Sequence, residues 1–242
     1  MTESSTPTVV LVHGAFADAS SYARVIPELL VDGFAVVAPA VPNRGLIGDA
    51  AYIASVVRQV PGPVILVGHS YGGAVITVAG TEPNVRALVY LAGYALEQGE
   101  SLAELQGRFP DSDLARALVH TPFPIDGTTG TGTDVTVNVA DFPAIFAADV
   151  EPGLAAVLAV SQRPLAARAF AERAPAAAWR TTPSWGLVSS ADRTINPEVE
   201  RFGYRRAGMT TVEVDSSHLV MLAHPEQVAD LIREAAHATA PH

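Results

Sequence analysis

The chain of 242 residues contains no cysteine and no lysine, and its 15 basic residues are all arginines. The absence of cysteine excludes disulfides, thiolate nucleophiles, zinc ribbons and iron–sulfur clusters. The absence of lysine excludes lysine Schiff bases, Walker-type phosphate loops and serine enzymes whose base is a lysine. A serine nucleophile in this chain would therefore need a histidine as its base.

An excess of positive charge and long apolar runs are also lacking. The 15 arginines face 25 Asp and Glu residues, a formal net charge of −10, so we expect neither nucleic acid nor an anionic membrane surface as a partner. Residues 1–7 lack the basic and apolar parts of a signal peptide, and no apolar run approaches the length of a membrane span. These absences predict a soluble, cytoplasmic protein, whose length suits one domain with an inserted cap.

A short apolar run that ends at a serine stands out near the centre of the first half of the chain. Residues 64–67 are Val-Ile-Leu-Val, which is typical of a strand buried on both faces. Residues 68–72, Gly-His-Ser-Tyr-Gly, match Gly-x-Ser-x-Gly, and an apolar helical segment follows at residues 74–79. A strand–turn–helix of this kind holds its serine at a strained backbone angle, near the free amides of the helix start. A plain glycine-rich turn is the alternative for the pentapeptide alone, but its surroundings favour a nucleophile at Ser70.

Strand-forming and helix-forming runs alternate on both sides of an irregular middle segment. Strands are expected at residues 8–12, 34–39, 64–67, 85–91, 183–188 and 210–214, with helices at about 22–31, 49–60, 74–79 and 225–238 and another opened by Asn196 and Pro197. This alternation predicts an α/β fold with a doubly wound, mainly parallel sheet of about six strands. We expect a core of residues 1–94 and 181–242, with residues 95–180 forming an inserted cap.

The expected cap contains helical pieces and one hairpin. The helical pieces are expected at about residues 100–107, 112–119, 143–150 and 153–173. A Gly/Thr-rich stretch at 127–133 leads into an alternating run at 134–139. This pattern predicts a hairpin rather than a phosphate loop, because Gly-x-Gly-x-x-Gly is incomplete and no buried strand precedes it.

Three of the loops that follow predicted core strands carry Ser70, Asp192 and His218, in that order. In an open parallel sheet, ligands bind beyond the carboxyl ends of the strands, so we expect these side chains to meet there. Their order along the chain is that of the nucleophile, acid and base in α/β-hydrolases.

With these loops, nearly the whole chain outside the cap resembles the α/β-hydrolase superfamily of the serine esterase type. Besides the elbow at Ser70, the resemblance rests on His-Gly-Ala-Phe at 13–16, Ser-Ser-Ala-Asp-Arg-Thr-Ile-Asn-Pro at 189–197 and Ser-Ser-His-Leu-Val-Met-Leu-Ala-His-Pro-Glu at 216–226. These look like the family's oxyanion, acid and histidine loops. The chain is similar to the small-capped branch of methyl-ester esterases and hydroxynitrile lyases, although Leu219 stands where the lyases carry a lysine.

The resemblance implies acyl transfer and an α/β-hydrolase fold, without a cofactor. A metal is not expected either, because the chain has no His-Glu-x-x-His motif and its carboxylates do not cluster with histidines. His218 would take the proton of Ser70, and Asp192 would hold the imidazole in the right tautomer and stabilise its charged form. Asp215 is the competing acid, while Glu198 and Glu200 are expected to be charges on a helix surface.

The tetrahedral intermediate of acyl transfer needs donors for its oxyanion. The amides of Tyr71 and Ala15 are the expected pair, with Phe16 as the alternative second donor. His13 is expected to fix the oxyanion loop rather than to act as the base. His69 and His224 are the other histidines near these motifs.

Apolar residues in the cap and beside the predicted histidine base are expected to bind substrate. They are Leu96, Phe123, Phe142, Phe146 and Leu219. Together they predict a hydrolase for a carboxylic ester of a small, largely apolar molecule. Lactone or amide hydrolysis, perhydrolysis, a carbonyl-forming lyase and a slowly turning-over small-molecule receptor stay open as alternatives on the same residues, and a homodimer stays open as the assembly.

Overall fold

The computed structural model describes residues 6–125 and 127–240. The expectation about a signal peptide at residues 1–7 therefore rests mainly on residues that lie outside the described part of the chain. Among the described residues, no helix combines the length and the apolar character that a membrane crossing requires.

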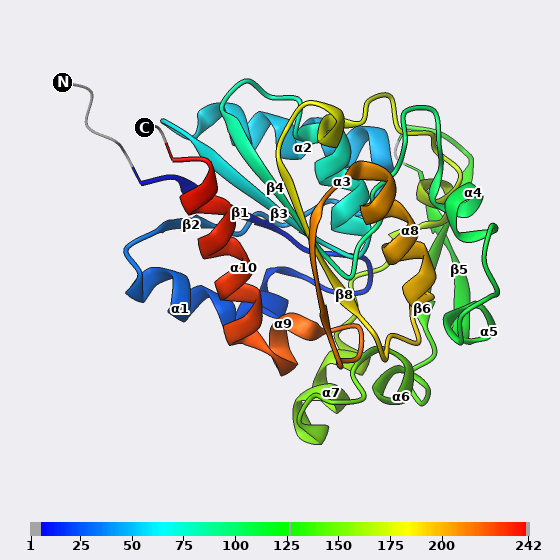
Figure 1. The fold of residues 1–242 in the computed structure, drawn as a ribbon. Coiled ribbons are helices and arrows are strands. Elements are labelled where there is room, and N and C mark those ends of the chain that lie inside the picture. Colours follow the sequence, from blue (N-terminus) through cyan, green and yellow to red (C-terminus); the bar gives the residue numbers. More distant parts are fainter. Residues whose placement is uncertain (1–5, 126, 241–242) are drawn as a thin grey trace.

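A sheet of six strands, each parallel to its neighbours, forms the body of the molecule (Figure 1). Side by side, the strands are β2 (Ala35–Val37), β1 (Thr8–Val12), β3 (Val64–His69), β4 (Val85–Leu91), β8 (Ser184–Ser189) and β9 (Thr210–Val214). The chain moves from β1 outward to β2 and then returns to β3 on the other side of β1, which creates a switch point between β1 and β3. The predicted doubly wound, parallel α/β sheet is confirmed.

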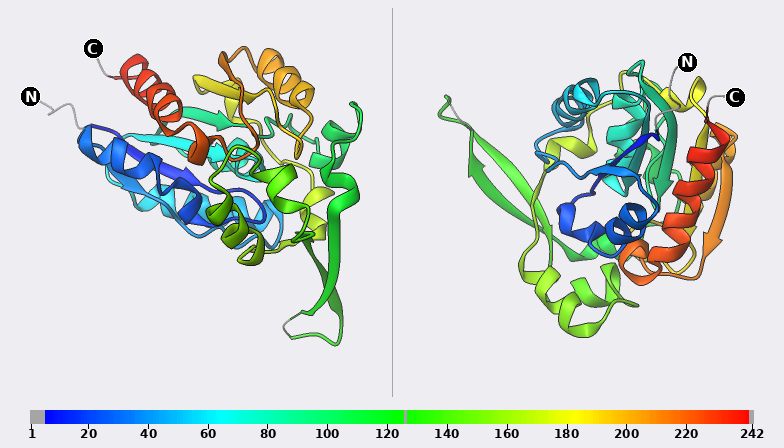
Figure 2. Two further views of the ribbon diagram at one scale, coloured as in Figure 1. Left: turned by 90° about the horizontal axis from the view of Figure 1, so that it is seen from below. Right: turned by 90° about the vertical axis from the view of Figure 1, so that its left-hand side faces the viewer.

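Helices cover both faces of this sheet. α1 (Val25–Val31) packs against α10 (Pro225–Ala238), and α2 (Leu46–Gln59) packs against α3 (Tyr71–Ala79). In the right-hand view of Figure 2, α2 and α3 lie on one side of the sheet and α10 lies on the other. Every residue of β1 and β3 is consequently buried, which explains why these strands are apolar without alternation. The remaining elements outside the segment between β4 and β8 are α8 (Pro197–Ala207), α9 (Val220–Ala223) and a 3₁₀ turn, η1 (Ala19–Tyr22).

The segment between β4 and β8 carries a second, antiparallel sheet in the order β5-β6-β7. Its elements are α4 (Leu102–Gln106), α5 (Leu114–Ala117), β5 (Leu118–Pro124), β6 (Thr131–Val137), α6 (Phe142–Phe146), α7 (Pro152–Val160), β7 (Leu165–Ala166) and the 3₁₀ turns η2 (Ala167–Phe170) and η3 (Ala178–Arg180). β5 and β6 form the predicted hairpin, which projects from the body as an arm (Figure 2). The division into a core of residues 1–94 and 181–242 and a cap of residues 95–180 stays a prediction.

Two of the predicted helices in this segment end earlier than expected. The helix expected at 112–119 ends at Ala117, and β5 begins at Leu118. The two prolines of β5 are tolerated because it is an edge strand that pairs with β6 alone. The helix expected at 153–173 ends at Val160. Pro164 disfavours helical geometry in the residue before it, and the chain then adds Leu165 to the small sheet.

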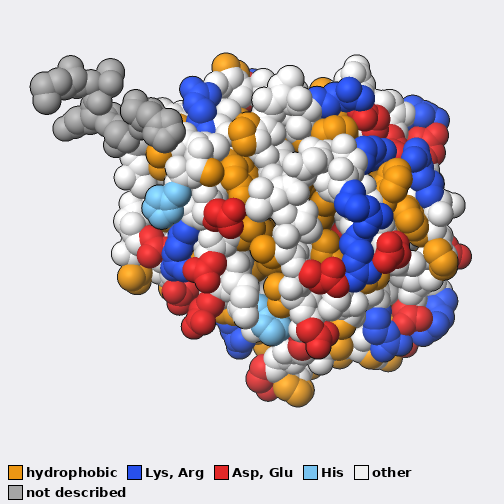
Figure 3. Space-filling view, in the orientation of Figure 1, with side chains coloured by type: hydrophobic (Ala, Val, Ile, Leu, Met, Phe, Trp, Pro, Cys, Tyr) orange, Lys and Arg blue, Asp and Glu red, His pale blue; other side chains and the backbone are white. Residues whose placement is uncertain are grey.

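Arginines and carboxylates lie interspersed on the surface, as the face in Figure 3 shows. Arg233 on α10 bonds Asp32 at the end of α1, at 2.7 Å. Arg206 on α8 bonds the buried Glu100, which follows β4, also at 2.7 Å. Such pairs connect elements that are distant in sequence, although an exposed pair typically contributes only about 0–1 kcal/mol.

The elbow between β3 and α3 leaves no room for side chains at its two outer glycines. A Cβ on Gly72 would lie 2.3 Å from the carbonyl oxygen of Val12 on β1. A Cβ on Gly68 would lie 2.4 Å from the carbonyl oxygen of Gly72. Because both contacts are with backbone atoms, no side-chain rearrangement can relieve them. The glycines of the motif therefore allow β1, β3 and α3 to meet at backbone distance.

We expect Gly72→Ala to lower the free energy of unfolding by about 3 kcal/mol or more, the upper range for overpacking a filled interior. Gly48→Ala is the matched control, because Gly48 lies within α2 and no atom lies within 4 Å of the added Cβ. Alanine in a helix interior stabilises by up to about 1 kcal/mol relative to glycine. Urea unfolding measures both, and equal midpoints for the two variants would contradict the tight elbow.

Candidate active site

Ser70 occupies the turn between β3 and α3 in the strained conformation that the motif predicts. Its φ is +55°, a region that residues other than glycine rarely adopt. Its N–H donates to the carbonyl of Leu91 at 3.1 Å, and its carbonyl accepts from the N–H groups of Gly73 and Tyr94 at 2.9 and 3.2 Å. These backbone bonds hold the strained turn against β4. They use the N–H and the carbonyl of Ser70 but not its hydroxyl.

Asp192 and His218 form a buried pair on the loops that follow β8 and β9. His218 Nδ1 lies 2.6 Å from Asp192 Oδ2, and both side chains are fully buried. The other carboxylate oxygen, Oδ1, accepts the N–H groups of Thr194 at 2.6 Å and Ile195 at 3.1 Å. Because a carboxylate can only accept, the pair favours the His218 tautomer that carries its proton on Nδ1. The lone pair of Nε2 is then available to take a proton.

His69, the residue before Ser70, connects the elbow to the loop of His218. Its Nε2 donates to the backbone carbonyl of His218 at 2.9 Å, and the two rings lie 4.6 Å apart. His218 Nε2 itself is buried and has no hydrogen-bond partner in the described chain, so the bond to Ser70 is not formed in this structure. Hydrogen bonds of this kind are often long in unliganded sites and tighten in the complex.

The other buried histidines are not paired with a carboxylate. His13 Nε2 accepts the N–H of Val41, and its Nδ1 donates to the carbonyl of Gly14, both at 2.9 Å. His13 thus fixes the loop after β1. Burial lowers the pKa of His13, and burial together with the neighbouring His218 lowers the pKa of His69 well below its usual value. Both rings are therefore neutral near pH 7.

The candidate acids differ in whether their side chains are buried or exposed. Asp192 contacts the imidazole, whereas Asp215 is exposed on the loop after β9. Glu198 is exposed, as expected for a helix-surface charge. Glu200 is fully buried, so the expectation that it is a surface charge is wrong. Glu200 lies on the buried face of α8, and its carboxylate accepts the N–H of Ser189 at the end of β8.

An acid that the sequence did not indicate joins the inserted segment to the histidine loop. Asp149, which follows α6, accepts the N–H of Ser217 at 2.9 Å, the hydroxyl of Ser217, and the hydroxyl of Ser216 at 2.8 Å. Partial burial works to raise the pKa of Asp149, but these hydrogen bonds outweigh it and lower the pKa. His224 Nε2 lies 3.7 Å from the same carboxylate. Asp149 thereby anchors the two residues that precede His218.

The three candidate oxyanion donors differ in whether their amides are already used. The N–H of Phe16 donates to the carbonyl of Arg163 at 3.1 Å. Within the described chain, the N–H groups of Ala15 and Tyr71 make no such bond. The amide of Tyr71 also begins α3, where the helix dipole favours negative charge. Of the predicted donors, the geometry favours Ala15 and Tyr71 over Phe16.

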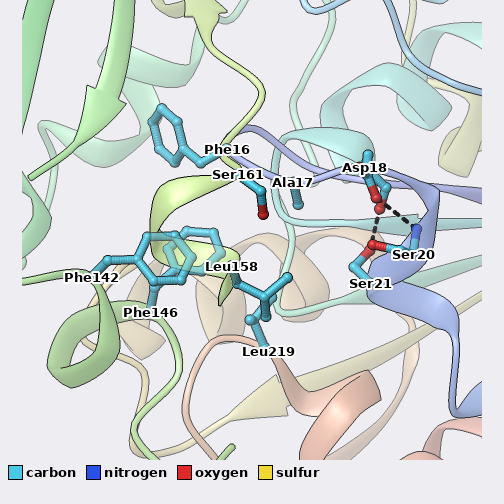
Figure 4. A pocket seen from close by; sticks show the side chains of 10 residues that line it. All are labelled: Phe16, Ala17, Asp18, Ser20, Ser21, Phe142, Phe146, Leu158, Ser161 and Leu219. Atoms are coloured by element: carbon cyan, nitrogen blue, oxygen red, sulfur yellow. Dashed lines mark hydrogen bonds between the residues drawn. The ribbon is translucent and has the colours of Figure 1, made fainter. Parts of the chain in front are cut away.

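A pocket with an apolar wall is lined in part by Leu219, the residue that follows His218 (Figure 4). It encloses about 320 Å³, part of which is open to solvent. Its apolar lining consists of Phe16, Ala17, Phe142, Phe146, Leu158 and Leu219, and its polar lining consists of Asp18, Ser20, Ser21 and Ser161. The Phe146 ring meets the His218 ring edge-on, with 4.6 Å between centroids. The pocket therefore adjoins the Asp192–His218 pair through Phe146.

Three of the five predicted substrate-binding residues line this pocket, namely Phe142, Phe146 and Leu219. The other two lie elsewhere. Phe123 is on the projecting β5, with the guanidinium of Arg44 4.8 Å from its ring centroid. Leu96 is fully buried in the core. This placement removes Phe123 and Leu96 from the candidate pocket. In the described ranges, no three His, Asp or Glu side chains gather to hold a metal ion.

The parallel sheet, the strained serine after β3 and the Asp–His pair on later strand-end loops define the class of α/β-hydrolase folds. The chain belongs to the alpha/beta hydrolase family, whose sequence profile matches residues 9–231. The family predicted from the motifs is thus confirmed.

Known proteins resemble the chain to different extents. A protein from Phoma sp. described as "Probable hydrolase R7" is 27% identical over 253 aligned positions, covering 95% of this chain and 98% of that protein. A carbendazim-hydrolysing esterase from Nocardioides sp. is 37% identical over 110 positions, which span 40% of this chain and only 46% of the esterase. The crystal structure of polyneuridine aldehyde esterase shares the fold, with a TM-score of 0.81 at 17% identity over 95% of this chain and 99% of that one.

Proposed function

We propose that the protein is a serine hydrolase that cleaves a carboxylic ester of a small, largely apolar substrate through an acyl-serine intermediate. The observation that carries this proposal is the buried Asp192–His218 pair, whose free Nε2 belongs to a loop that is hydrogen-bonded to the elbow of Ser70. A neutral imidazole with an available lone pair is the base that a serine hydroxyl needs to become a nucleophile.

The proposed reaction follows from what each group can do. His218 Nε2 takes the hydroxyl proton as Ser70 Oγ adds to the ester carbonyl, and Asp192 stabilises the resulting imidazolium. The amides of Ala15 and Tyr71 hold the oxyanion. The imidazolium then gives its proton to the departing alkoxide, which leaves as the alcohol. Water, activated by the same histidine, adds to the acyl-serine and releases the carboxylic acid and free Ser70.

The lining of the pocket supports a small, largely apolar ester as the substrate. Its apolar wall includes Phe142, Phe146 and Leu219, which suit an uncharged acyl or alcohol part. The relatives add support of the same kind, because one is described as a carbendazim-hydrolysing esterase and a fold neighbour is described as polyneuridine aldehyde esterase. Leu219 occupies the place of the lysine expected in the lyases of the similar branch, so an ester hydrolase is favoured over a lyase.

A fluorophosphonate probe tests the nucleophile without knowledge of the natural substrate. We expect the probe to add one equivalent of mass to the protein and to stop its hydrolysis of p-nitrophenyl acetate, butyrate and octanoate. Peptide mapping should place the label on Ser70, and the ranking of the three esters should report the size of the pocket. A protein that takes no label and turns over none of the esters would contradict the proposed function.

A further inference from the structure

A second buried carboxyl group lies behind the acid of the proposed site. Glu200, in the first turn of α8, is 0% exposed. Its Oε2 accepts the backbone N–H of Ser189, at the end of β8, at 3.0 Å. The proposed mechanism gives this side chain no role. A buried carboxyl of this kind needs an explanation, because burying a carboxylate without a partner is strongly unfavourable.

No cation neutralises Glu200 in the described part of the chain. Arg201, the next residue in the chain, directs its guanidinium to the exposed carboxylates of Glu198 and Glu213. The tyrosines Tyr94 and Tyr204 also face this region, and burial followed by the neighbouring carboxylates raises the pKa of both phenols, so they add no charge at neutral pH.

The acidic neighbour of Glu200 is Asp192, whose backbone N–H donates to the carbonyl of the same Ser189 that Glu200 Oε2 binds. Burial and the charge of Asp192 raise the pKa of Glu200 well above its usual value. Two neighbouring buried carboxyl groups cannot both be ionised at low cost. Asp192 is the member that remains charged, because three N–H groups, from Thr194, Ile195 and His218, point at its two oxygens.

The polar atoms of the pair can then be accounted for. Glu200 Oε2 is used as an acceptor by Ser189, whereas Oε1 is buried and accepts no hydrogen bond. A proton on Oε1 turns that atom into a donor and satisfies it, as buried polar groups require. Asp192 offers the acceptor, because its oxygens retain lone pairs after receiving the three N–H bonds.

We propose that Glu200 is a positioning residue, a neutral carboxylic acid that donates a hydrogen bond to Asp192 and so holds the carboxylate that holds His218. The inference rests on the proposed serine-hydrolase function. The extra donor fixes the orientation of Asp192 and draws off part of its charge. Asp192 is therefore a weaker attractor for the imidazolium proton than an unassisted carboxylate would be.

Infrared difference spectroscopy of the wild type against Glu200→Gln tests the proton directly and needs no substrate. We expect the wild type at neutral pH to show the carbonyl stretch of a protonated carboxylic acid that is missing from Glu200→Gln. The same comparison with Glu198→Gln should show no such band, because Glu198 is exposed on the same helix. Absence of the band from the wild-type difference spectrum would overturn the proposal, whatever the enzyme hydrolyses.

Kinetic measurements on two variants of Glu200 separate a hydrogen-bond donor to Asp192 from a side chain that only fills space. Glutamine at 200 keeps an acceptor for Ser189 and an N–H donor for Asp192, so kcat should stay within about threefold of the wild type. Methionine has a similar size and no donor, so kcat should fall by about tenfold to a hundredfold, as for a lost hydrogen bond to a charged group. Without the donor, Asp192 stabilises the charged imidazole more strongly, and the acidic limb of the kcat/KM profile should move to higher pH in Glu200→Met alone.

A role in packing alone would leave the acidic limb of the kcat/KM profile where it is in the wild type. Equal losses in Glu200→Gln and Glu200→Met, or an unmoved acidic limb in Glu200→Met, would contradict the donor role. If Glu200→Met does not fold, the infrared comparison of the wild type with Glu200→Gln still decides the matter. If no variant hydrolyses any ester, the proposed function fails while the infrared result stands on its own.

Discussion

Ser70→Ala should lower kcat for p-nitrophenyl butyrate by about 10⁴-fold or more and remove the acyl adduct seen by intact mass. The residual rate after loss of a serine nucleophile comes from the oxyanion donors and from binding alone. Folding should be unaffected, because the backbone bonds from Ser70 to Leu91, Gly73 and Tyr94 do not involve the hydroxyl. Circular dichroism and the urea midpoint check that point.

Ser55→Ala is the matched control for this experiment. Ser55 lies on the outer side of α2, where its hydroxyl bonds only the carbonyl of Tyr52. Its kcat and its adduct should equal those of the wild type. Turnover and adduct formation that survive in Ser70→Ala would show that another group is the nucleophile.

The sequence predicted the parts of the structure that depend on local pattern. The apolar run at 64–67 and the glycines around Ser70 indicated a buried strand and a strained turn, because only those structures need that composition. The order of Ser70, Asp192 and His218 in strand-end loops then indicated where the loops would meet, since parallel strands place their carboxyl ends at the same edge of the sheet.

The parts that the sequence could not predict depend on contacts between distant segments. Ala15 and Phe16 are adjacent, and only the carbonyl of Arg163, far along the chain, distinguishes their amides. Glu200 is of a residue type that is usually exposed, yet it lies on the buried face of α8 with Val199, Gly203 and Tyr204. Asp149 binds Ser217 across 68 positions of sequence. No local pattern encodes contacts of this range.

The inserted segment is therefore more than a cover for the pocket. Its Arg163 carbonyl occupies the amide of Phe16, and its Asp149 anchors the residues before His218. Its Phe146 packs edge-on against the His218 ring. The segment thus contacts the loop after β1 and the loop of His218 at the same time, which couples the shape of the pocket to the geometry of the proposed base.

Asp192→Asn should lower kcat by about 10⁴-fold at neutral pH, through the tautomer of His218. The N–H groups of Thr194 and Ile195 point at Oδ1 of Asp192, so an asparagine would keep its carbonyl oxygen there. Its NH₂ group would then face Nδ1 of His218 and donate to it. That arrangement requires the proton of His218 on Nε2, where it blocks acceptance of the proton from Ser70.

Two measurements and one control variant test the role of Asp192. Nitrogen-15 NMR of the histidine rings should report the proton of His218 on Nδ1 in the wild type and on Nε2 in Asp192→Asn, while the urea midpoint changes little. Asp215→Asn is the control, because Asp215 is the exposed acid of the loop that carries His218, and its kcat should remain within about threefold of the wild type. A large loss in Asp215→Asn with near-normal activity in Asp192→Asn would transfer the role of the acid to Asp215. The opposite pattern, together with the changed tautomer, would establish that the carboxylate of Asp192 acts by fixing where His218 carries its proton.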